Sequence, residues 1–236
     1  MKILYIFPHP DDESFGPAPA MRQQLTQGNQ VYLLTLTRGG ATRQRHKYNL
    51  SIEEMGEVRS GELQAAADTI GITGLIITDL PDSGMKEMDP RDIEAVIKKQ
   101  IMEIRPDVVV TYAVHGISGF HDHLVCHNVV KRVFCELRGG KGMPRRLALY
   151  TLSDAAETNG HFRLNTSTDE EIDCIVATTD DEVEAGRKAL DCYQTYLETI
   201  EKTGIREMVS MDVCYEFFQE SYDPPVDDVF FGLNVE

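Results

Sequence analysis

Short runs of β-branched and other apolar residues alternate with longer helical patterns along most of the chain. This alternation limits the possible folds more than any other feature. Six runs are typical of buried strands: residues 2–7, 30–36, 75–78, 107–112, 146–152 and 172–177. Strands that alternate with helices form βαβ units around a parallel sheet. We therefore predict an α/β fold with a largely parallel sheet flanked by helices.

Helix-starting signals separate several of these runs. Residues that favour N-caps, followed by a glutamate or a proline, open three predicted helices at Ser51, Asp89 and Thr179. The first helix ends at Gly71, and the third is expected to continue as one long helix to near Gly204. No internal repeat and no Pro/Gly-rich linker interrupts the pattern, so we predict a single domain over residues 1–236.

The charge balance limits the kinds of partner that the protein can bind. The 23 Lys and Arg residues against 39 Asp and Glu residues give a formal net charge of -16, which would repel phosphate backbones and anionic lipid. We therefore expect neither nucleic acid nor membrane as a partner. Five cysteines without a close pair suit a reducing compartment, and the apolar start stops at Pro8, too early for a signal peptide. These features predict a cytoplasmic protein.

Polar segments follow the first four predicted strands. They are residues 8–13, 37–40, 79–84 and 115–123. Ligands of open parallel sheets bind beyond the carboxyl ends of the strands. If the four strands are parallel neighbours, these segments meet at one edge, where we expect the functional site.

Two of these segments contain a possible metal-ligand set. His9 and Asp12 lie three residues apart on a turn, and His123 can supply a third ligand, as catalytic zinc usually requires. Asp11 is adjacent to Asp12, so the two side chains should point in different directions. Asp11 can then act as a general base toward a metal-activated water. The alternatives are a proline-rigidified turn that caps a helix and a polar loop with surface histidines.

The same residues resemble a known family, the LmbE-like or PIG-L-like zinc-dependent deacetylases. The resemblance rests on Pro8-His9-Pro10-Asp11-Asp12-Glu13 and on Gly116-Ile117-Ser118-Gly119-Phe120-His121-Asp122-His123, with weaker echoes in 57–63 and 188–195. It implies a Rossmann-like domain that removes the acetyl group from an N-acetylglucosamine-type sugar or sugar conjugate. It also implies a small-molecule amino-sugar substrate and, since oligomers are common in the family, a homo-oligomer.

The resemblance also assigns roles to residues. His9, Asp12 and His123 would bind zinc, although iron or another divalent metal suits the same ligands. Asp11 would be the general base, Asp122 would orient a catalytic histidine, and Arg59 would help to bind substrate.

One position departs from the family pattern. The family commonly reads Gly-His-Pro-Asp-His, whereas this chain has Phe120 in place of the expected catalytic histidine. We hypothesise that His121 or His115, in the same loop, takes over that role.

Other candidates have structural alternatives. His123 and His127 would share a helix face and could form a metal pair, although packing explains His127 equally. Asp82 can bind sugar hydroxyls or stabilise its turn. Arg38 belongs to a basic cluster with Arg43, Arg45, His46 and Lys47, which is either a solvated loop or a wall for an anionic part of the substrate.

Two other functions compete with deacetylation. One is an amidase for a larger N-acyl group, since the pocket rather than the metal decides acyl size. The other is a metal- or sugar-binding module whose hydrolytic site is impaired, as Phe120 suggests. The apolar segment 215–218 is expected to pack on the sheet or on another subunit.

Overall fold

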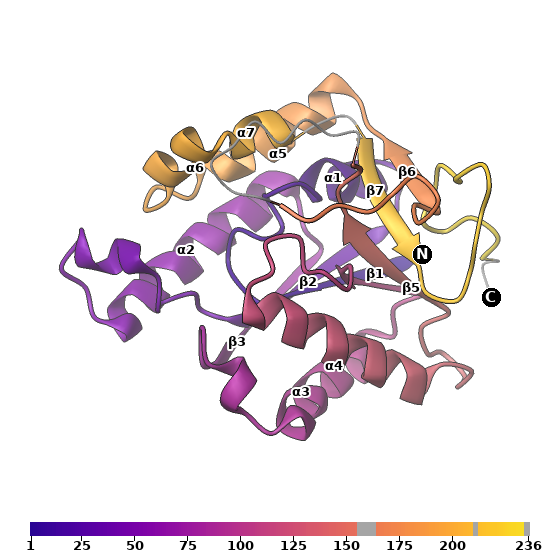
Figure 1. Cartoon of the computed structure of the whole chain (residues 1–236), viewed down its shortest axis with the longest axis horizontal. Coiled ribbons are helices and arrows are strands. Elements are labelled where there is room, and N and C mark those ends of the chain that lie inside the picture. The colour runs from indigo at the N-terminus through magenta and orange to yellow at the C-terminus, as the bar shows by residue number, and fades with distance from the viewer. Residues whose placement is uncertain (155–163, 210–211, 234–236) are drawn as a thin grey trace.

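A single sheet runs through the computed structural model, which describes residues 1–154, 164–209 and 212–233. In these residues the strand order is β3-β2-β1-β4-β5-β7-β6 (Figure 1). The strands are β1 (Lys2–Phe7), β2 (Gln30–Thr37), β3 (Gly74–Leu80), β4 (Val108–Tyr112), β5 (Arg146–Thr151), β6 (Cys174–Ala177) and β7 (Asp212–Phe217). The helices are α1 (Ala18–Thr26), α2 (Ile52–Ile70), α3 (Pro90–Ile104), α4 (His121–Leu137), α5 (Asp180–Asp191), α6 (Leu197–Thr203) and α7 (Ile205–Met208).

The first five strands are parallel, which confirms the predicted fold class. Ile3 of β1 pairs with Val31 of β2 on one side and with Val108 of β4 on the other. All six predicted strands are present, and their ends differ from the prediction by at most two residues. Segment 215–218, expected to pack on the sheet or on another subunit, contributes to β7, which enters the sheet antiparallel between β5 and β6.

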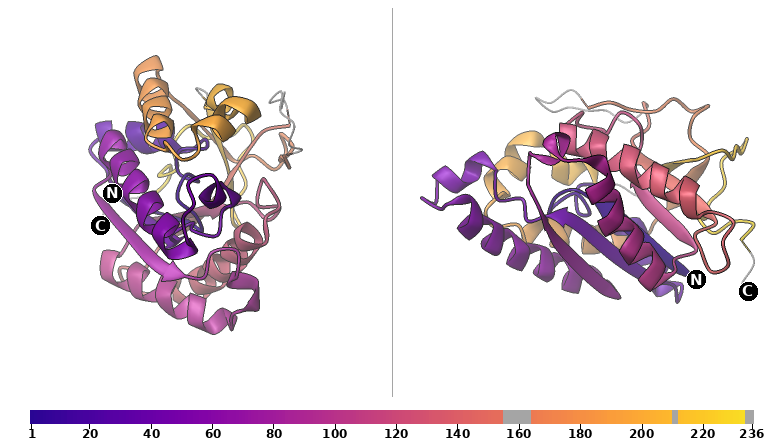
Figure 2. Two further views of the ribbon diagram at one scale, coloured as in Figure 1. Left: turned by 90° about the vertical axis from the view of Figure 1, so that its left-hand side faces the viewer. Right: turned by 90° about the horizontal axis from the view of Figure 1, so that it is seen from below.

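The sheet separates two apolar layers, because successive side chains of a strand point to opposite faces. Tyr5 and Phe7 lie in a core with residues of α1, α2 and α5, whereas Leu4 and Ile6 pack against α3 and α4. The two groups of helices lie on opposite sides of the sheet (Figure 2). Burial on both faces explains why the central strands are continuously apolar.

The predicted helix starts are largely confirmed. Ser51 caps α2 with a reciprocal hydrogen bond to Glu54, and α2 ends at Gly71 in the left-handed conformation. The Asp89 side chain accepts a hydrogen bond from the backbone N of Arg91 at the start of α3.

The prediction of one long helix after Thr179 is wrong. The chain leaves the helix after Asp191 and begins α6 only at Leu197. Buried carboxylates from the first half of the chain hold this break. Tyr193 donates to Glu13 at 2.6 Å, and the Thr195 backbone N and hydroxyl donate to Glu62 at 2.7 Å each.

A buried arginine holds the C-terminal segment against the sheet. Arg146 at the start of β5 is 1% exposed and donates to the Glu220 carboxylate at 2.6 and 2.9 Å. It also donates to the carbonyl of Val229 and lies over the ring of Phe217. Among the described residues, no helix is both long and apolar enough to cross a membrane.

Candidate metal centre

The carboxyl ends of four neighbouring parallel strands meet at one edge, as predicted. The strands β3, β2, β1 and β4 are adjacent in the sheet, and a cavity of about 700 Å³ opens beyond them. Its lining includes His9 after β1, Ala41 after β2, Asp82 after β3 and His123 after β4. A cavity of this size lies in the range of small-molecule sites.

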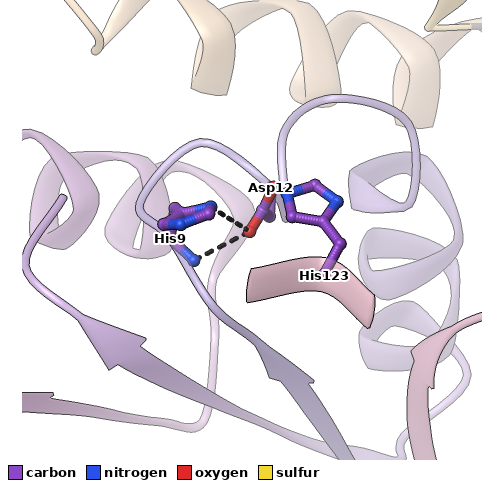
Figure 3. Close-up of side chains that lie close together, drawn as sticks. All are labelled: His9, Asp12 and His123. Carbon is purple, nitrogen blue, oxygen red and sulfur yellow. Dashed lines mark hydrogen bonds and ion pairs between the residues drawn. The ribbon is translucent and has the colours of Figure 1, made fainter. Parts of the chain in front are cut away.

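The structure brings His9, Asp12 and His123 together at this edge (Figure 3). One ligand atom from each lies within 4.8 Å of the others. His123 Nε2 is 3.4 Å from Asp12 Oδ1, and His9 Nδ1 is 3.6 Å from Asp12 Oδ2. Two ligands that bind zinc tetrahedrally at normal bond lengths are roughly 3.4 Å apart. The spacing of these atoms therefore fits a divalent cation.

Hydrogen bonds fix which nitrogen of each histidine is free to bind. Nδ1 of His123 lies 2.9 Å from the carbonyl O of Gly116, which can only accept, so Nδ1 carries the proton and Nε2 faces Asp12. In the same way Nε2 of His9 lies 3.2 Å from Asp122 Oδ2, which leaves Nδ1 toward Asp12. Outer partners of this kind orient metal-binding histidines. The donor set therefore fits a metal by chemistry as well as by distance.

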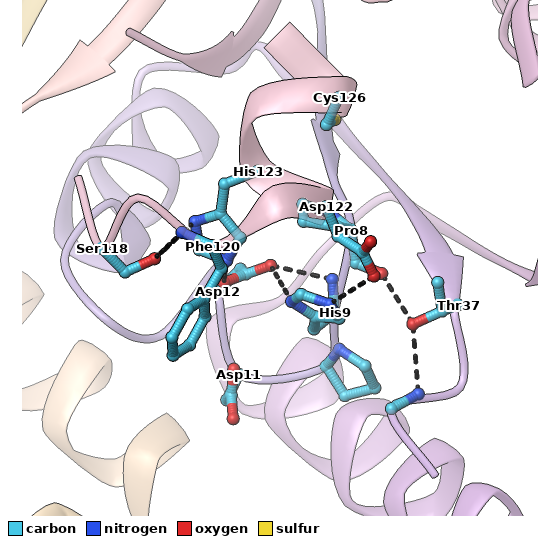
Figure 4. Close-up of polar contacts among 12 residues, drawn as sticks. Pro8, His9, Asp11, Asp12, Thr37, Ser118, Phe120, Asp122, His123 and Cys126 are labelled. Carbon is cyan, nitrogen blue, oxygen red and sulfur yellow. Dashed lines mark hydrogen bonds and ion pairs between the residues drawn. The ribbon is translucent and has the colours of Figure 1, made fainter. Parts of the chain in front are cut away.

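Asp122 and Asp12 lie on opposite sides of His9 (Figure 4). Asp122 is 2% exposed, and its Oδ2 also accepts a hydrogen bond from the Ser83 backbone N at 2.7 Å. Asp82 Oδ1 lies 3.4 Å from His9 Nε2, and Asp82 Oδ2 accepts from the Ala41 backbone N at 2.6 Å. Both carboxylates therefore contact the outer nitrogen of His9.

Asp11 is held beside the ligand set in an unusual backbone conformation, with φ of 94°. Its carboxylate forms an ion pair of 2.5 Å with Arg59, which is 2% exposed. Arg59 also donates to the carbonyls of Pro10 and Gly39 and lies over the Tyr196 ring. Strained residues of this kind cluster at functional sites. Both terminal nitrogens of Arg59 are thus engaged by the protein and hold the turn that carries Asp11.

The electrostatics separate the two neighbouring carboxylates. Burial raises the pKa of Asp11 to about 7, against the opposing charge of Arg59 and with the help of the Asp12 charge. Burial acts on Asp12 in the same direction, but His123 and His9 outweigh it and lower the pKa of Asp12 to about 2. Paired groups with separated pKa values are typical of acid–base sites. Asp12 is therefore the constant anion of the pair, and Asp11 titrates near neutrality.

The ligand histidines also have shifted pKa values. Burial lowers the pKa of His123. Burial has the same effect on His9, but hydrogen bonds to Asp12 and Asp122 outweigh it and raise the pKa to about 10.

The remaining predicted residues lie farther from the ligand set. Among the described residues that line the cavity, neither His121 nor His115 appears. His121 is exposed on the first turn of α4. His115 accepts from the Ile117 backbone N at Nδ1, and its Nε2 lies within 3.3 Å of two hydroxyl oxygens. The hypothesis that one of them replaces the missing histidine gains no support from this geometry.

Phe120, His127 and Arg38 also have defined places. Phe120 is 60% exposed and packs edge-on against His123 with ring centroids 5.7 Å apart (Figure 4). His127 Nδ1 faces the carbonyl of Tyr112, and its Nε2 faces the Lys131 ammonium, so both nitrogens are occupied by protein partners. Arg38 forms ion pairs with Glu57 and Asp79 outside the described cavity lining.

The sequence patterns did not reveal the role of Tyr112 at the site. Tyr112 donates to Asp12 Oδ1 at 2.7 Å and stacks on His123 with ring centroids 4.3 Å apart. Its place as the last residue of β4, at the functional edge, was the available signal. The structure also explains why residue 39 is a glycine. Its φ is 65°, and a Cβ there would lie 2.6 Å from Arg59 Nη1.

The fold and the site together define an α/β protein with a His/Asp group that could hold a metal ion at the carboxyl edge of a parallel sheet. Residues 4–134, more than half of the chain, match the PIG-L family, described as GlcNAc-PI de-N-acetylase. The chain belongs to this family.

A curated relative from Kineococcus radiotolerans is 32% identical over 168 residues. It is named 1D-myo-inositol 2-acetamido-2-deoxy-alpha-D-glucopyranoside deacetylase, and the match covers 60% of this chain and 46% of the relative. The chain thus spans about half the length of the curated relatives it matches.

Solved structures share the fold at low sequence identity. The N,N'-diacetylchitobiose deacetylase of Pyrococcus horikoshii matches with a TM-score of 0.68 and 17% identity, over 98% of this chain and 86% of that one. The 4-carboxy-2-hydroxymuconate hydratase GalB of Pseudomonas putida also matches with a TM-score of 0.68, at 12% identity over 94% and 97% of the two chains. Since a deacetylase and a hydratase share the fold, the reaction has to be argued from the site.

Proposed function

We propose that the protein is a metal-dependent hydrolase that removes the N-acetyl group from an N-acetylglucosamine-type sugar or sugar conjugate. The observation that carries this proposal is the convergence of His9, Asp12 and His123, with the outer ring nitrogen of each histidine held by an acceptor outside the set. Family membership and the name of the curated relative support the same reaction and an amino-sugar substrate.

His9, Asp12 and His123 would hold the cation, with zinc as the first candidate and iron as an alternative. A bound divalent cation supplies a Lewis acid and lowers the pKa of a coordinated water. Asp11, with its pKa raised to about 7, accepts the proton of the attacking water. Asp11 then returns this proton to the amine nitrogen as the C–N bond breaks, so that acetate and a free amine leave. In this proposal Asp11 also serves as the leaving-group acid, because Phe120 occupies the position of the expected histidine.

Two further predictions accompany the function. One domain over residues 1–236 is supported by β6 and β7, which join the same sheet as the N-terminal strands. A cytoplasmic location and a homo-oligomer stay predictions from the sequence.

The test combines metal analysis with acetate release on a panel of N-acetylglucosaminyl compounds. Protein purified without chelator should contain about one divalent ion per chain and release acetate. Asp11→Asn should keep the metal and lose at least about a hundredfold in turnover, whereas His123→Ala should lose both. Asp92→Asn, at an exposed aspartate on α3 outside the described cavity lining, is the matched control and should keep both.

Two results would contradict the proposal. An unchanged rate in Asp11→Asn would remove Asp11 from the mechanism. Bound zinc without turnover on the whole panel would favour the metal- or sugar-binding module.

A further inference from the structure

The cavity lining combines two kinds of chemistry. Polar groups such as Thr42, Asp82 and Ser83 line it beyond β2 and β3. Apolar side chains line it as well, and six of them come from segments far apart in the sequence: Phe15, Tyr150, Leu152, Leu164, Ile205 and Met208. We call these six residues the apolar wall.

The apolar wall begins next to the metal ligands. The Tyr112 ring stacks on His123 with centroids 4.3 Å apart, and the Tyr150 ring follows at 6.1 Å from Tyr112. Tyr150 is seated against the β1–α1 turn, because a Cβ at Gly16 would lie 1.7 Å from its hydroxyl oxygen. A group attached close to the reacting amide can therefore reach the wall.

The wall is built into the protein, and the residues that the structure describes leave it partly uncovered. Phe15, Leu152, Leu164 and Ile205 pack against the larger core cluster, yet each stays partly exposed. Apolar side chains that line a concave site and keep contact with water are typical of ligand-binding surfaces. Sugar hydroxyls placed against this wall would lose water without gaining hydrogen bonds. The single methyl of an acetyl group is too small to cover six side chains.

We propose that the substrate carries an apolar group larger than a methyl beside the scissile amide, and that this group covers the apolar wall. The inference rests on the proposed function, since that function places the amide at His9, Asp12 and His123. The apolar group is either the aglycone of an N-acetylated sugar or an acyl chain longer than acetyl. In the second case the same metal chemistry would remove that longer acyl group, because the pocket decides acyl size.

A binding experiment tests the wall without catalysis. Octyl β-D-glucoside, kept below its micellar concentration, should bind at least about tenfold more tightly than methyl β-D-glucoside, because each buried methylene strengthens binding about threefold to fourfold. Met208→Gln and Leu152→Asn should each reduce this preference at least about threefold. Met102→Gln is the matched control, because Met102 is 50% exposed on α3 and is absent from the described cavity lining.

Two kinetic series then identify the source of the apolar group. One varies the acyl chain of N-acylglucosamines from acetyl to octanoyl, and the other varies the aglycone of N-acetylglucosaminides from methyl to octyl. A rise of kcat/KM with chain length in either series, weakened by Met208→Gln, supports the proposal and assigns the wall to that group.

Equal binding of the two glucosides overturns the inference, as do flat kinetics in both series. Failure of the proposed function would look different. The zinc-loaded protein would cleave no substrate in either series but would still bind octyl glucoside more tightly than methyl glucoside. This binding preference would be larger in the wild type than in Met208→Gln.

Discussion

Removal of the Asp122 carboxylate should weaken metal binding rather than act directly on the reaction. Asp122 contacts the outer nitrogen of His9 at 3.2 Å and so keeps Nδ1 free to bind a cation. Loss of such an outer partner usually costs about 10- to 100-fold in metal affinity. In this chain Asp82 is a second acceptor 3.4 Å from the same nitrogen, and it can replace Asp122 in part.

We therefore expect Asp122→Ala to weaken zinc affinity about tenfold, which corresponds to about 1.4 kcal/mol. The double variant Asp82→Ala/Asp122→Ala should approach a hundredfold. Asp122→Asn should have the smallest effect, because its amide oxygen can still accept from His9 and from the Ser83 backbone N. The other carboxylate oxygen, Asp122 Oδ1, is buried without a described partner and would be replaced by the amide nitrogen.

The assay is a competition titration of zinc against a chelating dye, with thermal unfolding as a check on folding. Asp79→Ala, at a carboxylate with 82% side-chain exposure, is the control and should leave the affinity unchanged. If Asp122→Ala kept its zinc affinity within twofold but lost a hundredfold in kcat, Asp122 would act on the reaction. The argument from His9 would then be refuted.

Three other substitutions test separate parts of the structure. Gly16→Ala should destabilise the protein by about 2–4 kcal/mol in urea unfolding, because φ is 148° and the new Cβ would collide with Tyr150; a cost below about 0.5 kcal/mol would contradict the packing described. Arg146→Ala should lower the free energy of unfolding by about 3 kcal/mol, since it leaves the Glu220 carboxylate without its cation. Arg91→Ala, which removes an exposed ion pair, should show no such loss in the same unfolding assay. Phe120→His should raise the release of acetate at least about tenfold by adding an acid–base group to the cavity lining, and an unchanged rate would show that the site does not lack that group.

The sequence patterns predicted the features that local rules govern. Apolar runs identified the central strands because both faces of the sheet are buried, and capping residues placed the start of α2. The convergence of His9, Asp12 and His123 followed from the rule that parallel strands present their carboxyl ends at one edge.

Features that depend on distant contacts could not be read in this way. The break between α5 and α6 depends on hydrogen bonds from Tyr193 and Thr195 to Glu13 and Glu62, more than 130 residues earlier. The contact between Asp122 and His9 depends on where α4 begins relative to the turn after β1. The family resemblance implied only that Asp122 orients a catalytic histidine, so it did not reveal this contact.

The cavity is assembled from two halves of the chain. The proposed base and the three ligand residues lie within 4–134, the part that matches the family, whereas five of the six residues of the apolar wall lie beyond residue 134. Substitutions after residue 134 can therefore alter which molecules enter the site while the reacting groups stay intact. Two relatives with nearly identical first halves can thus differ in preference, and a chimaera that exchanges only the second half should transfer preference without transferring chemistry.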